Sequence, residues 1–65
     1  ELARQHRITE LEAEQLTMLA LAYRDQRDLE RAQGCAREAV ELFSSIGLET
    51  EADRAHQLLA EVSAL

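Results

Sequence analysis

The apolar positions of this chain recur at steps of three and four residues, the spacing of one face of an α-helix. No segment alternates apolar and polar residues as a half-buried strand would, and there is no proline. We therefore expect an all-α fold of about three helices. The three apolar stripes are Ala13, Leu16, Leu19, Ala20 and Tyr23; Leu29, Ala32, Ala36, Ala39, Val40 and Phe43; and Ala55, Leu58, Leu59, Val62 and Leu65.

Capping residues predict where the helices begin and end. Thr9 followed by Glu12 has the capping-box pattern, and Asp28 and Thr50 are good residues for the starts of two further helices. Gly47 can adopt the left-handed conformation that closes a helix. Because the connections are short, consecutive helices should be antiparallel and form hairpins. We expect the end of a preceding helix over 1–6 and helices over 10–26, 28–46 and 50–65.

An internal repeat is visible at an offset of 40 positions. Residues 18–20 (Met-Leu-Ala) then align with residues 58–60 (Leu-Leu-Ala), and Ile8 aligns with Leu48. The matches fall at helix ends, loops and apolar stripes on both sides. A repeat of this length is typical of a helical solenoid.

The stretch from Glu14 to Ser44 combines large apolar and small residues in a recognisable order. These residues are Leu16, Leu19, Ala20 and Tyr23 in the first helix, Asp28 and Leu29 at the turn, and Ala32, Ala39, Val40 and Leu42 in the second helix. In this pattern the stretch resembles a tetratricopeptide repeat, a hairpin of two helices. Arg27 stands where this family usually has a turn glycine, Ala36 where it often has a large residue, and Ser44 where it often has a closing proline. The 40-residue offset also exceeds the family's usual repeat of about 34 residues. This long-linker variant is similar to repeats of large bacterial regulators and signalling ATPases.

The resemblance implies a non-catalytic function, the binding of a peptide or protein on the concave face formed by the first helix of each repeat. Thr17 and Leu21 occupy places where the family's clamp for C-terminal carboxylates has Lys, Arg or Asn, so that kind of binding is not expected. An ordinary polar surface is the alternative interpretation of this face. Carried over to this sequence, the concave face consists of Glu14, Thr17, Leu21, Arg24, Arg54, Gln57 and Glu61.

The charge of the chain narrows the classes of partner. The net charge is −6, and the seven basic residues, all arginines, are scattered among thirteen acidic ones. Nucleic acids and acidic membrane surfaces require clustered basic residues and are disfavoured, whereas basic or mixed-charge protein partners fit. No apolar run has the length of a membrane span. The chain begins with Glu1, which favours a fragment of a larger protein, and a cytoplasmic location is the default expectation.

The candidate chemical groups have ordinary structural interpretations. Cys35 is the single cysteine, so it cannot form an internal disulfide, and its spacing from His6 and His56 matches no zinc pattern. The glutamates are expected on solvated helix faces. We therefore expect no catalytic site, metal or cofactor. Gly34 lies within a predicted helix and is either a tolerated weak position or a place where another helix approaches closely.

A homodimer is the alternative function, formed through apolar edges that a longer array of repeats would cover. A plain three-helix bundle around one central core is the alternative fold. The edge residues expected to pair in a dimer are Leu2, Leu42, Ile46, Leu48, Leu58 and Leu65.

Overall fold

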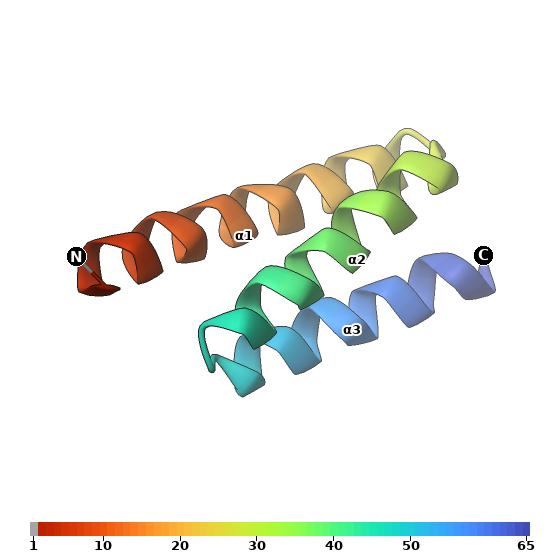
Figure 1. Cartoon of the computed structure of the whole chain (residues 1–65). Helices are drawn as coiled ribbons and strands as arrows, with labels where there is room; N and C mark the ends of the chain where they lie inside the picture. Colours follow the sequence, from red (N-terminus) through yellow and green to blue (C-terminus); the bar gives the residue numbers. More distant parts are fainter. Residues whose placement is uncertain (1) are drawn as a thin grey trace.

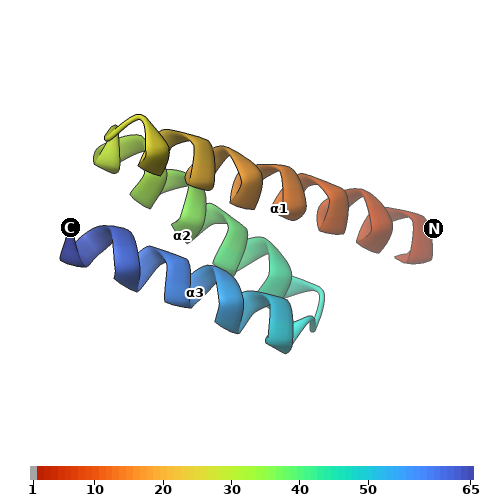
Figure 2. The same ribbon diagram turned by 180° about the vertical axis from the view of Figure 1, so that it is seen from behind.

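The computed structural model describes residues 2–65 of the chain, with side chains from residue 4 onward. It contains three helices, α1 (Leu2–Asp25), α2 (Leu29–Ser45) and α3 (Glu49–Ala64), and no strand in the described residues. Figures 1 and 2 show α1 and α3 running alongside α2 in the direction opposite to it. The expected all-α fold of three helices is confirmed.

The start of the first helix was predicted wrongly. α1 runs without interruption from Leu2 to Asp25, so Thr9 lies inside a helix and does not cap one. The segment before Thr9 contains Leu, Ala, Gln and Arg, which are strong helix formers, and no Gly or Pro, so nothing in it interrupts the helix. The expected separate helix over 1–6 is therefore part of α1; its first residue lies outside the described part.

The two turns have the same backbone design. Arg27 (φ 65°) and Gly47 (φ 78°) both adopt the left-handed conformation. After each, an amide returns to the preceding helix: Asp28 N–H donates to the Tyr23 carbonyl at 2.9 Å, and Leu48 N–H donates to the Phe43 carbonyl at 3.0 Å. These bonds satisfy carbonyls that the end of a helix would leave free. The predicted closing role of Gly47 is confirmed.

The two helix starts differ in their capping. A carboxylate oxygen of Asp28 accepts a hydrogen bond from the Arg31 backbone N–H at 3.4 Å, as expected of an N-cap. Leu48 occupies the cap of α3 and makes no side-chain capping bond, and Thr50 lies in the first turn of that helix. The predicted capping role of Thr50 is therefore wrong.

Small side chains form most of the core, in two clusters that each draw on all three helices. Alanines at these contacts let the helix axes approach closely, as expected from the sequence. Leu19 was expected in this core but is 47% exposed, whereas Leu58 is only 7% exposed. The first cluster consists of Ala13, Ala39, Phe43, Ala52 and Ala55, and the second of Ala20, Ala32, Ala36, Leu58 and Val62.

Gly34 lies on the exposed side of α2, and a Cβ atom added there would have no neighbour within 4 Å. No helix of the described chain approaches it. The close approach of a helix from the next repeat or from a second chain stays a prediction. Gly34→Ala is expected to raise the free energy of unfolding by about 0.5–1 kcal/mol, because Ala loses less backbone entropy in a helix. Urea unfolding followed by circular dichroism measures the change. Gly47→Ala is the matched control and should destabilise the chain, because its φ of +78° strains any residue with a Cβ.

Candidate protein-interaction groove

A groove of about 450 Å³ lies between α1 and α3, over α2. Its floor is formed by Phe43 of α2 and Ala55 of α3, which are both buried members of the first core cluster. The groove is thus an open edge of the core. Its walls are Glu14, Thr17 and Met18 from α1 and Glu51 and Arg54 from α3.

The packing of α1 explains which side chains reach the groove. Ala13 and Ala20 are fully buried against the other helices. Thr17 lies beside these two alanines on the helix surface, at the edge of the buried side of α1, and is half-buried. The Thr17 hydroxyl donates a hydrogen bond to the Ala13 carbonyl at 2.9 Å. Its proton is therefore engaged within the helix, and its oxygen can still accept a hydrogen bond from a ligand.

The rim of the groove is charged around an apolar floor. Glu14 and Arg54 are exposed, and Glu51 is half-buried. Two carboxylates and one guanidinium make the rim acidic on balance, as the whole chain is. An apolar side chain can occupy the floor while a basic neighbour pairs with Glu14 or Glu51.

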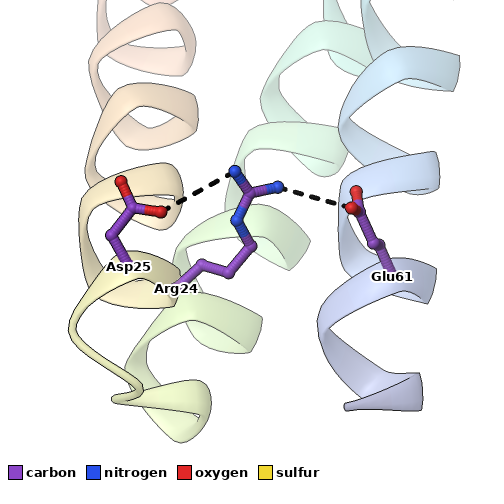
Figure 3. Close-up of polar contacts among 3 residues, drawn as sticks. All are labelled: Arg24, Asp25 and Glu61. Carbon is purple, nitrogen blue, oxygen red and sulfur yellow. Dashed lines mark hydrogen bonds and ion pairs between the residues drawn. The ribbon is translucent and has the colours of Figure 1, made fainter.

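An ion pair joins the two walls beyond one end of the groove. Figure 3 shows the Arg24 guanidinium between Glu61 of α3, at 3.5 Å, and Asp25, at 3.8 Å. Exposed pairs of this kind contribute at most about 1 kcal/mol to stability. The Arg24–Glu61 contact links α1 and α3 at this end. A second hollow of about 350 Å³ lies there, lined by Arg24, Asp25, Arg27, Glu61 and Leu65.

The structure brings together some residues of the predicted concave face. Glu14, Thr17 and Arg54 line the groove, and Arg24 and Glu61 form the ion pair. The other two, Leu21 and Gln57, are exposed and line neither hollow. Sequence reasoning missed the groove residues Met18, Phe43, Glu51 and Ala55; Phe43 and Ala55 were recognised as apolar stripe residues, without their second role as a floor.

The apolar edge predicted for self-association is not a continuous exposed surface. Leu58 is buried in the second cluster and is not available to a second chain, which corrects that prediction. Leu42, Ile46 and Leu48 are half-buried, and Leu65 is exposed. The side chain of Leu2 lies outside the described part. The large apolar residues that are exposed lie mostly on α1: Ile8, Leu11, Met18, Leu19 and Leu21, with Leu65 after α3.

Cys35 has the properties of a packing residue. It is half-buried against the second cluster. Burial, and secondly the charge of Glu38, raise the pKa of its thiol. A raised pKa keeps the thiol protonated at neutral pH and weakens it as a nucleophile.

The described residues contain neither a metal-binding cluster nor a membrane-spanning helix. Within residues 2–65, no three His, Cys, Asp or Glu side chains are grouped as a metal site would require. No helix in this range has the length and apolar character needed to cross a membrane.

The chain was also compared with known proteins. No protein-family model, curated protein or solved structure matches it.

Proposed function

We propose that this chain is a non-catalytic protein-interaction module that binds a peptide or protein segment in the groove between α1 and α3. The observation that carries the proposal is the apolar floor of Phe43 and Ala55 framed by a charged rim. An apolar floor with a few polar groups around it is the usual composition of a binding site. Three rim residues, Glu14, Thr17 and Arg54, also belong to the concave face that the tetratricopeptide resemblance implies.

We also propose what kind of larger protein contains this chain. Two antiparallel hairpins that share α2 are compatible with a short part of a tetratricopeptide-type solenoid in a larger regulatory protein. The unpaired thiol of Cys35 supports a cytoplasmic location, where thiols stay reduced.

The rim indicates the chemistry of the partner. Glu14 and Glu51 favour a segment that places a basic residue beside an apolar anchor. The groove holds only a few side chains, so we expect a weak, transient complex, such as those with small interfaces.

Peptide selection with charge-reversal variants tests this function. Peptides selected on the wild-type chain from a displayed random library are remeasured on Glu14→Arg/Glu51→Arg and on the matched control Glu38→Arg/Glu41→Arg. The control makes the same change in net charge at exposed positions of α2 that do not line the groove. We expect the Kd of the selected peptides to rise at least about tenfold for the groove variant, which corresponds to about 1.4 kcal/mol of binding free energy. The Kd for the control should be unchanged.

The remaining outcomes count against the proposal. Equal losses in the two variants would indicate attraction by overall charge, and no loss in either would place the binding site elsewhere. A failure to select any peptide would contradict a peptide-binding groove.

A further inference from the structure

The N-terminal turns of α1 project beyond the other two helices. α1 has 24 residues, seven more than the 17 of α2, which runs back along it. Figures 1 and 2 show the start of α1 extending past the turn that joins α2 to α3. Every side chain from Arg4 to Ile8 is exposed. We call residues 4–8 the projecting segment.

The projecting segment is basic, whereas the rest of the chain is acidic. It contains Arg4 and Arg7 and no acidic residue, while residues 9–65 contain five arginines and twelve acidic residues. Neither Arg4 nor Arg7 forms an ion pair with another residue of the range 4–65. Cations near the N-terminus of a helix are unfavourable because they oppose its dipole. An acidic surface that pairs with these two arginines would offset that cost.

The side chains of the projecting segment match those that the groove favours in a partner. The rim, with Glu14 and Glu51, favours a basic residue beside an apolar anchor. Arg7 adjoins Ile8, a large apolar residue that is 51% exposed. Arg4 lies one turn before Ile8 on the same side of the helix, because residues four apart are neighbours on its surface. The segment therefore supplies both the charge and the apolar group that complement the groove.

The projecting segment cannot enter the groove of its own chain. α1 is an uninterrupted helix from Leu2 to Asp25. Glu14 and Met18, which line the groove, lie further along this same helix. A continuous helix does not fold back on itself, so only the segment of another copy can reach the groove.

The surface of α1 is self-complementary when two copies run antiparallel. With the two Leu11 side chains facing each other, residues 4–8 of each copy lie beside residues 14–18 of the other. Arg7 is then close to Glu14 of the second copy, and Leu11, which is 53% exposed, meets its equivalent on the two-fold axis. The residues involved all lie within about 60° of Leu11 around the helix axis: Arg4, Arg7, Ile8, Glu14 and Met18.

We propose that the groove binds the projecting segment of a second copy, so that two chains exchange these segments in a symmetric dimer. Because the exchange is mutual, the assembly closes at two chains and does not grow further. The inference rests on the groove of the proposed function and names its partner. The interface differs from the apolar edge expected from the sequence, which included Leu42, Ile46 and Leu48.

A pair of charge-reversal variants tests the exchange. Arg4→Glu/Arg7→Glu makes the projecting segment acidic, and Glu14→Arg/Glu51→Arg makes the rim of the groove basic. Each variant alone brings like charges together, so its dimer Kd, measured by sedimentation equilibrium, should exceed that of the wild-type chain at least about tenfold. An equimolar mixture of the two variants restores opposite charges at both exchanges. We therefore expect the mixture to dimerise.

Two matched controls make the same changes in net charge elsewhere. Arg27→Glu/Arg37→Glu and Glu38→Arg/Glu41→Arg alter exposed residues outside the groove and the projecting segment. Both controls should dimerise as the wild-type chain does. Acidic side chains are favourable near the N-terminus of a helix, so the variant with an acidic projecting segment should keep its circular dichroism spectrum.

The proposal is overturned if the wild-type chain stays monomeric at high micromolar concentration, or if the mixture of the two variants does. An equal loss of dimer in the controls would indicate that overall charge governs association and would also refute it. The variant with an acidic projecting segment retains the groove and should bind selected peptides at least as tightly as the wild-type chain. A monomeric wild-type chain that binds such peptides in the groove would exclude the second copy and leave the proposed function standing.

Discussion

Replacing Phe43 with Ala is expected to lower the free energy of unfolding by about 3–5 kcal/mol. Phe43 is 3% exposed and is the largest side chain in the first core cluster. The other buried members of that cluster are alanines, which are too short to fill the cavity that the substitution leaves; the larger Leu16, Val40, Leu42 and Leu48 pack around the cluster and are only partly buried. Chains of this length have a total stability of roughly 3–10 kcal/mol, so much of the folded population should be lost.

Urea unfolding followed by circular dichroism at several temperatures measures this loss. Leu65→Ala is the control, because Leu65 is 63% exposed and its removal should change stability by no more than about 0.5 kcal/mol. A loss below about 1 kcal/mol for Phe43→Ala would mean that the aromatic ring is not buried as described.

Leu58→Ala is expected to destabilise the chain by about 2–5 kcal/mol, while Met18→Ala changes stability by no more than about 0.5 kcal/mol. These two residues occupy equivalent positions at the 40-residue offset. Leu58 is 7% exposed in the second cluster, and Met18 is 67% exposed on α1, where it lines the groove. The same kind of truncation therefore removes core packing in one helix and mostly solvated surface in the other.

Urea denaturation curves give the free energies of unfolding of the two variants. The slope of this free energy against urea concentration should be the same for both. Similar effects of the two substitutions would contradict the assignment of Leu58 to the core and Met18 to the surface. A large loss for Met18→Ala alone would show that this side chain is covered in solution and is not exposed as described.

Periodicity predicted the existence and order of the helices because their apolar spacing is regular. The start of α1 was missed because a capping box is only a local pattern. Thr9 and Glu12 have the right identities, but the residues before Thr9 favour the helix, so the chain does not leave it there. A sequence pattern at a possible cap does not by itself outweigh a helix-forming segment on both sides.

The burial of the leucines was only partly predictable. α1 has apolar residues on two sides, so its periodicity does not identify the side that faces the core. Leu19 was grouped with Ala13 and Ala20, but it lies about 100° around the helix axis from Ala20 and is 47% exposed. Leu58 was assigned to an apolar stripe and also to an exposed edge, and the structure supports only the first assignment.

The sequence predicted part of the rim of the groove but not its floor. Glu14, Thr17 and Arg54 came from the family resemblance, which places the first helices of repeats on one face. The floor was not foreseen because Phe43 serves both the core and the groove, and a sequence does not show where a core opens to solvent. The long-range Arg24–Glu61 ion pair depends on the packing of α1 and α3 at the end of the helices, which no local pattern specifies.

Amide-shift mapping with a peptide selected on the wild-type chain tests the central claim most directly. The isotope-labelled chain is titrated to saturation, and every amide shift is followed. We expect the largest changes at Glu14, Thr17, Glu51 and Arg54, around the groove between α1 and α3. Changes concentrated instead at Glu38 and Glu41 on α2, or at the exposed Ile8, Leu11 and Leu19 of α1, would contradict the groove as the binding site.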